Sequence, residues 1–179
     1  MELNPKLNSE VKVHFEDSHA EILLAQFIKG NLKENTVIIC IGTDRCIGDA
    51  LGPFIGSQLQ KNRFRFPLYG TLDDPIHALN LKESVEKILS KHPNSHIIAI
   101  DACLGDESLI GYIHGRQGAI YPGKGVGKKL PGVGHISIVG IVDKLKNDDA
   151  FAIHNIRLSL VMKMVDVIVD AFLLATYLS

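Results

Sequence analysis

Two aspartates in this chain each follow a stretch of residues that predicts a buried strand. Asp49 lies in the segment GTDRCIGDALGP, residues 42–53, directly after the β-branched stretch 36–41. Asp101 comes immediately after the apolar stretch 96–100. If the two strands are parallel neighbours, both carboxyl groups emerge at the edge of the sheet where open α/β proteins place their chemistry. Two carboxyl groups that meet there can share a proton, so that one serves as an acid and the other as a base.

The spacing leaves simpler roles open for the same residues. Asp49 could cap the following helix, and Asp101 could accept a hydrogen bond from a loop amide. Thr43, Asp44 and Arg45 precede Asp49 in one loop and are candidate substrate-binding residues. Asp44 is equally suited to a turn, and Arg45 could orient a carboxylate or face solvent.

A thiol nucleophile is an alternative to the acid pair. Cys46 and Cys103 lie in the two loops that carry the acids, and a nearby histidine could serve as the base for either thiol. The sequence shows no feature that would activate these thiols. A buried cysteine that packs as a small apolar residue is therefore the favoured interpretation.

A histidine close to the acids would complete a metal site. His154 precedes the last predicted helix and His135 starts a late strand, and either could reach the same edge of the sheet. Asp49, Asp101 and His154 would together offer oxygen and nitrogen ligands. A lone histidine is more often structural, and no local metal motif accompanies these residues, so the favoured interpretation has no metal.

Glycines are concentrated in two segments, and the first of them does not predict a phosphate site. Residues 42–53 lack the Gly-Lys-Ser/Thr end of a P-loop and the Gly-x-Gly-x-x-Gly pattern, and Asp49 would place negative charge against a phosphate. Residues 116–134 form the second segment, a loop that could act as a flap over the site. Lys124 and Lys128 in this loop are candidate substrate-binding residues, although surface lysines more commonly face solvent.

Composition favours one domain spanning residues 1–179, without a linker or a repeat that would divide it. Lys plus Arg number 19 and Asp plus Glu number 20, so the net charge of −1 argues against a nucleic-acid surface or an anchor on an acidic membrane. Three cysteines and no signal pattern indicate a reducing, cytoplasmic compartment. The apolar stretch 155–178 carries scattered charges, and it predicts a core helix, or a helix shared with a second subunit, rather than a membrane span.

Strand and helix patterns alternate over the first part of the chain, which predicts an α/β fold with a largely parallel sheet. Ser18 with Glu21, and Asn80 with Glu83, suggest helix caps, and Gly30 suits the end of the first helix. An extended arm precedes that helix. The predicted helices are 19–29, 50–62 and one that ends at residue 90, and the predicted strands are 36–41, 66–70, 96–100, 109–115 and 135–142.

Three segments, residues 42–53, 98–104 and 118–129, resemble the germination protease of spore-forming bacteria. Over about residues 36–178 the chain is similar to the smaller sporulation proteins of the YyaC family, and more remotely to the hydrogenase maturation endopeptidases. The resemblance implies a phosphorylase/hydrolase-like fold, which is a three-layer αβα sandwich around a mixed, mainly parallel sheet.

The resemblance also implies a function and a site. The essential acids of germination protease fall on Asp49 and Asp101, which implies a sporulation-associated peptidase that uses an aspartate pair to activate water. The nickel ligands of the maturation endopeptidases fall on Asp49, Asp101 and His154, so an endopeptidase that recognises nickel or zinc is the first alternative. A catalytically inactive spore protein that binds a partner at the same site is the second, and a nucleotide or phosphate binder is the third.

The implied partner is a protein or peptide substrate, with small acid-soluble spore proteins as candidates, rather than nucleic acid or a membrane. No cofactor is expected for the aspartate pair. The implied compartment is the cytoplasm of the spore or forespore, and a homo-oligomer remains open.

Overall fold

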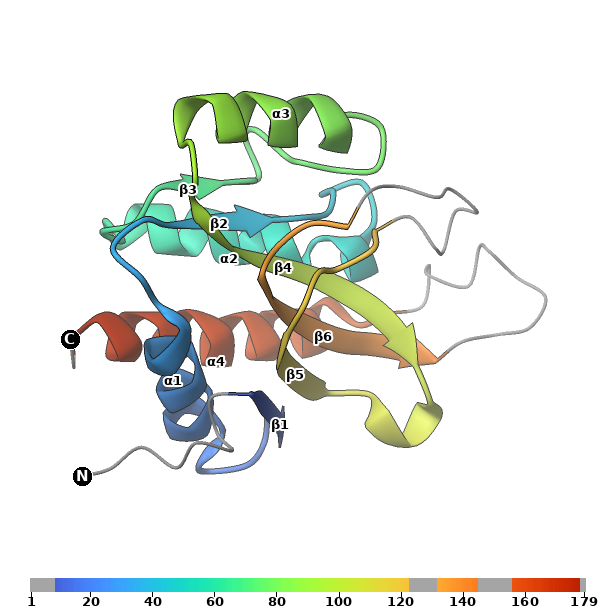
Figure 1. Ribbon diagram of the computed structural model, residues 1–179. Helices are drawn as coiled ribbons and strands as arrows, with labels where there is room; N and C mark the ends of the chain where they lie inside the picture. Colours follow the sequence, from blue (N-terminus) through green and yellow to red (C-terminus); the bar gives the residue numbers. More distant parts are fainter. Residues whose placement is uncertain (1–8, 123–131, 145–155, 178–179) are drawn as a thin grey trace.

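Strands and helices alternate through the first half of the chain, as the sequence patterns predict (Figure 1). The structure, a computed structural model, describes residues 9–122, 132–144 and 156–177. The strands are β1 (Glu10–His14), β2 (Thr36–Cys40), β3 (Leu68–Tyr69), β4 (His96–Gly105), β5 (Tyr112–Gln117) and β6 (Ile136–Lys144). The helices are α1 (Ala20–Asn31), α2 (Leu51–Lys61), α3 (Leu81–Lys91) and α4 (Leu158–Tyr177), with short 3₁₀ turns η1 (Ile47–Asp49) and η2 (Glu107–Leu109).

Within the described ranges, the strands form one mixed sheet of six strands in the order β1-β5-β6-β4-β2-β3. The pairs β6–β4, β4–β2 and β2–β3 are parallel, whereas β1–β5 and β5–β6 are antiparallel. The predicted α/β fold with a mixed, mainly parallel sheet is confirmed. The extended arm before the first helix is the edge strand β1, and its pairing with β5 was not predicted.

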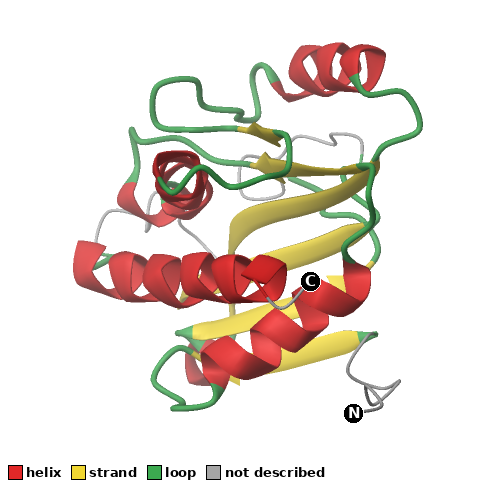
Figure 2. Ribbon diagram, turned by 90° about the vertical axis from the view of Figure 1, so that its left-hand side faces the viewer, coloured by secondary structure: helices red, strands yellow, loops and turns green. Residues whose placement is uncertain are grey.

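Alternate residues of the central strands enter two separate apolar clusters, one on each face of the sheet. In β2, Ile38 and Cys40 join the cluster that contains residues of α1, α2 and α4, while Val37 and Ile39 join the cluster that contains residues of α3. Figure 2 shows α1, α2 and α4 together on one side of the sheet. The sheet therefore lies between two layers of helices, with one apolar cluster on each of its faces. This arrangement agrees with the expected αβα sandwich.

The apolar stretch near the C-terminus forms α4, and one side of this helix is buried in the core. The prediction of a core helix is confirmed, while a helix shared with a second subunit, and with it a homo-oligomer, stays a prediction. In the part of the chain that the structure describes, no helix has the length and apolar character needed to cross a membrane. The buried residues keep a helical period: Val161, Met164, Val165, Ile168, Val169, Ala171, Phe172 and Ala175.

The predicted ends of the first helix at Ser18 and Gly30 are wrong, whereas Asn80 has its predicted N-cap position without the side-chain cap bond. The N-cap residue of α1 is His19, and its side chain makes no cap hydrogen bond. The helix continues past Gly30 and ends at Asn31. Asn80 does precede α3, but its side chain binds the backbone of His77 and Pro75 instead of the first turn of the helix. A strand predicted at 109–115 starts later, at Tyr112, because η2 occupies the residues before it.

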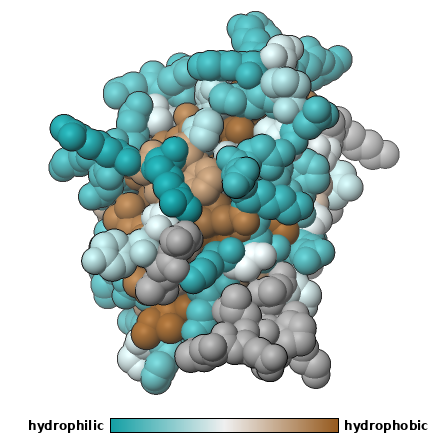
Figure 3. Space-filling view, turned by 60° about the vertical axis from the view of Figure 1, so that its left-hand side comes forward, coloured by the Kyte–Doolittle hydropathy of each residue, from teal (hydrophilic) through white to brown (hydrophobic). Residues whose placement is uncertain are grey.

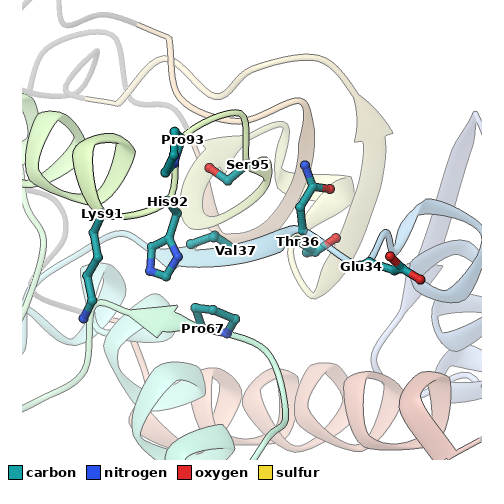
Figure 4. Close-up of a pocket in the computed structure, with 9 residues that line it drawn as sticks. Glu34, Thr36, Val37, Pro67, Lys91, His92, Pro93 and Ser95 are labelled. Carbon is teal, nitrogen blue, oxygen red and sulfur yellow. The ribbon is translucent and has the colours of Figure 1, made fainter.

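The amino-terminal ends of β2 and β4 lie at one edge of the sheet, next to a pocket of about 270 Å³ (Figure 4). Thr36, His92 and Ser95 are among its lining residues. The Nε2 atom of His92 lies 2.8 Å from the hydroxyl oxygen of Tyr69 in a hydrogen bond. The pocket of Figure 4 lies at the opposite end of the strands from the predicted acids.

Figure 3 brings the left-hand side of Figure 1 forward, and apolar residues reach the surface there between hydrophilic ones.

Candidate active site

The β2 strand gives way to a loop at Gly42, where the chain turns away from its neighbour β4. The amide of Ile41 still donates to the carbonyl oxygen of Ile100 in β4, with an N···O distance of 2.7 Å. The amide of Gly42 donates instead to the carbonyl oxygen of Ile76, also at 2.7 Å. Since β4 continues beside β6 as far as Gly105, it extends beyond the end of β2 at the carboxyl-terminal edge of the sheet.

This edge is also where the connections of the chain diverge. From β2 the chain passes through α2 to β3 on one side, and from β4 it passes to β5 and β6 on the other side. In open α/β sheets, binding sites lie outside the carboxyl ends of the strands at such a point. The topology therefore marks the end of β2 and the adjacent part of β4 as the candidate site.

Asp49 is held against the end of β2 by the loop 42–49. The amide of Thr43 donates to the carbonyl oxygen of Asp49 at 3.0 Å. Gly42 has a φ of +141°, and a Cβ atom at this position would overlap the Asp49 carbonyl oxygen, so the loop can close this tightly only on a glycine. The residue that caps α2 is Ala50, without a side-chain cap bond, and the alternative role of Asp49 as the helix cap is therefore wrong.

Asp101 lies within β4 rather than after it, which corrects the predicted strand end at residue 100. It pairs with Val139 of β6, and the pair of Ile100 with Cys40 just before it is the last between β4 and β2. Asp101 is 8% exposed, and its Oδ1 atom accepts a hydrogen bond of 2.8 Å from the amide of Ala102. The acid thus binds an adjacent amide, as the simpler interpretation predicts, and also lies where β4 has lost its β2 neighbour.

The two aspartates lie close enough for their charges to interact. Burial raises the pKa of Asp101 well above its usual range, and the charge of Asp49 raises it further, against a smaller opposing effect of the Ala102 amide. Burial also raises the pKa of Asp49, while the Thr43 amide and the charge of His77 lower it. The pair can therefore hold one proton, with Asp101 as the protonated member. The structure brings the two acids together, and their catalytic role stays a prediction.

His77 belongs to the same site, although sequence reasoning missed it. Its charge acts on Asp49, and the preceding residue, Ile76, forms an isolated parallel bridge with Ile41 at the end of β2. No local pattern points to this contact, since it depends on a backbone bond between segments that lie far apart in the sequence. Asn80, three residues later, could have pointed to this segment because its side chain binds the backbone of His77 and Pro75. Its sequence pattern instead suggests a helix cap.

Only three of the five predicted substrate-binding residues lie in the part of the chain that the structure describes. Thr43 is half-buried, and its Oγ1 atom accepts a hydrogen bond of 3.3 Å from the amide of Arg45. Asp44 and Arg45 are exposed in the loop that leads to Asp49, while positions 124 and 128, both lysines, lie outside the described residues. Substrate binding by these five residues stays a prediction.

Comparison with known proteins places this chain in a family. The family model described as "Protein of unknown function (DUF1256)" matches residues 12–171. The chain belongs to the DUF1256 family. A similar protein, "Uncharacterized protein YyaC" of Bacillus subtilis (strain 168), is 40% identical over 151 residues, which are 84% of this chain and 74% of YyaC. The resemblance to YyaC is confirmed, whereas the likeness to germination protease and to the maturation endopeptidases stays a prediction.

Cys103 of this DUF1256 chain is poorly suited to act as a nucleophile. Burial and the nearby charge of Asp101 raise the pKa of Cys103 to about 11, against an opposing effect of Arg116. Since the thiolate is the nucleophilic form, the protonated thiol of Cys103 is a weak one at neutral pH. For Cys103, the raised pKa favours the acids over the thiol as the reactive groups. Cys46 is also a half-buried free cysteine, and its role stays a prediction.

If the acid pair carries the predicted hydrolytic chemistry, Cys46→Ala and Cys103→Ala are expected to keep most of that activity. Each change removes a half-buried thiol, so we expect a loss of stability of roughly 1 kcal/mol and a folded protein. Turnover of a peptide substrate and the circular dichroism spectrum check the two points. Loss of turnover in a well-folded cysteine variant, with the aspartate variants still active, would reassign the chemistry to the thiol.

The alternative metal set of the DUF1256 chain is only partly visible. Asp49 and Asp101 lie together, but the histidine at position 154 is outside the described residues. Among the residues that the structure does describe, no group of three or more His, Cys, Asp or Glu side chains could hold a metal ion. His135 accepts a hydrogen bond of 3.0 Å at Nδ1 from the amide of Ile97, near the start of β4. The prediction that His135 reaches the edge with the acids is therefore wrong.

We expect the DUF1256 protein, as purified, to contain no stoichiometric nickel or zinc, because an acid pair that activates water directly needs no metal. A chelator should then leave intact any hydrolytic activity that the acid pair provides. Elemental analysis of the purified protein, with activity measured before and after chelation, checks both points. A stoichiometric ion whose removal abolishes activity would favour the maturation-type endopeptidase instead.

Proposed function

We propose that this protein is a peptidase-type hydrolase in which Asp49 and Asp101 activate a water molecule for attack on a peptide bond. The observation that carries the proposal is the acid pair at the carboxyl-terminal edge of two adjacent parallel strands. Paired carboxyl groups in different environments are the usual arrangement for acid and base work at one site. The two aspartates differ in burial, which supports different roles for them, one as the base and the other as the acid.

The more accessible acid, Asp49, serves as the base. It ends the η1 turn and is only half-buried. Burial raises its pKa, but Thr43 and His77 oppose this rise, whereas the pKa of Asp101 is raised well above its usual range. Asp101 is 8% exposed, and burial together with the charge of Asp49 favours its protonated form. Asp101 is therefore the acid, since it holds a proton that it can donate.

The proposed steps balance within the pair. Ionised Asp49 takes a proton from water as the water oxygen bonds to the peptide carbonyl carbon, while Asp101 gives its proton to the carbonyl oxygen. The resulting diol collapses when Asp49 passes its proton to the amide nitrogen and the C–N bond breaks. A diol hydroxyl proton then returns to Asp101. Each turnover consumes one water molecule and restores both acids.

The resemblance to germination protease supports a role in sporulation. The segments 42–53 and 98–104 carry this resemblance, and they hold both acids. We therefore propose proteins or peptides as substrates, small acid-soluble spore proteins first among them. The proposed compartment is the cytoplasm of the spore or forespore.

Incubation of the purified full-length protein with an extract of spore proteins tests the function. The matched control is Asp101→Asn, which keeps the size of the side chain and removes its proton-sharing capacity. New peptide ends, identified by mass spectrometry, should form with the wild-type protein and not with the variant. Absence of new ends from acid to neutral pH would overturn the proposal, and identical ends in both incubations would trace them to a contaminating protease.

A further inference from the structure

The pocket at the amino-terminal edge of the sheet has no part in the proposed function, since it lies at the opposite end of the strands from the acid pair. Three segments line it: residues 34–37 at the start of β2, Pro67 before β3, and residues 91–93 with Ser95, between α3 and β4. Its volume of about 270 Å³ is below the range of about 300–1,000 Å³ that is usual for drug-sized ligands. A ligand of this pocket is therefore a small molecule.

The side-chain hydroxyl of Ser95 lines this pocket without a hydrogen-bond partner. Ser95 is 6% exposed, and its Oγ atom is one of two buried side-chain N or O atoms without a partner among the residues that the structure describes. The other atom is Nε2 of His96, which is not part of the pocket lining. Buried hydroxyls are normally hydrogen-bonded, because an unpaired one lowers stability. The pocket therefore contains a hydroxyl group that is available to a ligand.

The walls around Ser95 are held by contacts of their own. The hydroxyl oxygen of Tyr69 and the Nε2 atom of His92 lie 2.8 Å apart in a hydrogen bond. The side-chain amide of Asn35 donates to the carbonyl oxygen of Asn94, which has a φ of +61°, a conformation that asparagine adopts more readily than most residues. The turn that carries Ser95 is thus tied to the start of β2, so the site is formed without a ligand.

The two charged residues of the pocket lining lie on opposite sides of it. Figure 4 shows Lys91 on one side and Glu34 on the other, with Val37 and Pro67 between them. The Nζ atom of Lys91 lies 5.8 Å from the centre of the Tyr69 ring, which keeps this ammonium group beside the pocket. A molecule that carries a carboxylate, a short apolar body and an ammonium group matches this order of positive, apolar and negative groups.

We propose that this pocket binds a small zwitterion, either a short peptide with free ends or a free amino acid. The carboxylate of the ligand accepts a hydrogen bond from the Ser95 hydroxyl and lies against Lys91, which is on the same segment, while its ammonium group lies against Glu34. The apolar body of the ligand packs on Val37 and Pro67. The inference goes beyond the proposed function and does not depend on it, because none of these residues belongs to the acid-pair site.

Titration of the ¹⁵N-labelled full-length protein with the dipeptide glycylvaline tests the inference by NMR. The amide signals of Val37 and Ser95 should shift and saturate, while the signal of Ala102, next to Asp101, should stay unchanged. N-acetylvaline lacks the ammonium group and glycylvalinamide lacks the carboxylate, so each should bind about tenfold more weakly, as for a lost hydrogen bond to a charged group. Free valine, titrated in parallel, distinguishes an amino acid from a peptide as the ligand.

Ser95→Ala separates ligand binding from a structural role of the hydroxyl. The variant should bind glycylvaline about fivefold more weakly, the usual effect of losing one hydrogen bond. The melting temperature of the ligand-free protein should not fall, because the removed hydroxyl has no partner. The matched control is Ser57→Ala, since Ser57 Oγ accepts a hydrogen bond of 2.9 Å from the amide of Leu72. This control should melt at a lower temperature and bind glycylvaline as the wild type does.

The absence of a saturable shift at about 10 mM glycylvaline would overturn the inference. Equal binding of N-acetylvaline or glycylvalinamide would also overturn it, because the pocket would then not recognise both charges. Unchanged binding by Ser95→Ala, or a melting temperature as low as that of Ser57→Ala, would give the hydroxyl a structural role instead. A shift of Ala102 in place of Ser95 would place the dipeptide at the acid pair and overturn the inference. Tighter binding of valine than of glycylvaline would support the inference and identify an amino acid as the ligand.

Discussion

Asp49→Asn and Asp101→Asn are each expected to lower the rate of peptide hydrolysis by about 10²- to 10⁴-fold, the usual effect of losing a general acid or base. The double variant should be little slower than either single variant, because residues that act as a unit are not additive. Rates of fragment formation from one peptide substrate, measured for the four proteins side by side, check this. A double variant whose loss is the product of the two single losses would show that the acids act independently.

A second measurement on the same variants separates chemistry from folding. Burial and Asp49 raise the pKa of Asp101 in the folded protein, so the folded state binds this proton more tightly than the unfolded chain. The stability that the proton provides is complete below the unfolded pKa and is lost as pH rises through the folded pKa. Asp101→Asn is neutral at every pH. Its melting temperature relative to the wild type should therefore increase from acid to neutral pH, and a constant difference would contradict the buried, proton-holding acid.

Gly42→Ala is expected to destabilise the protein strongly and to displace the loop that holds Asp49. The φ of +141° disfavours a side chain, and the added Cβ would overlap the carbonyl oxygen of Asp49. The backbone strain should cost about 1–2 kcal/mol and the overlap about 1–3 kcal/mol more of the free energy of unfolding. The displaced loop would also carry Asp49 away from Asp101, so hydrolysis should be lost in the folded fraction.

The matched control is Gly118→Ala. Gly118 also has a positive φ, of +103°, but a Cβ there would meet only the end of the Arg116 side chain at 3.8 Å. Urea unfolding of both variants separates the two terms, because Gly118→Ala should show the strain alone. Equal losses of stability in the two variants would mean that the loop 42–49 can move aside without cost.

The sequence predicts the central part of the fold because its signals are local. The β-branched residues of β2 and the helical spacing of α4 each identify an element without knowledge of its neighbours. The same local reasoning places Asp49 and Asp101 near the ends of two buried strands, and the parallel pairing of β2 with β4 then brings them to one edge.

What the sequence did not predict depends on contacts between distant segments. β4 runs on through Asp101 because β6 pairs with it there, and nothing in the residues of β4 specifies that partner. Asn80 has the pattern of a helix cap, yet its side chain serves the His77 segment instead. His77 itself reaches the site through the bond from Gly42 to Ile76, which no periodicity reveals.

The hydrogen bond from the Ile41 amide to the Ile100 carbonyl oxygen has a consequence for the order in which this protein folds. It joins positions about sixty residues apart in the sequence, and such distant contacts form only after a long loop has closed. During synthesis the ribosome therefore releases Asp49, its glycine turn and His77 well before the second acid exists. The nascent chain has no acid pair until β4 has emerged and docked beside β2, so that any hydrolytic activity of the pair can begin only after this strand has joined the sheet.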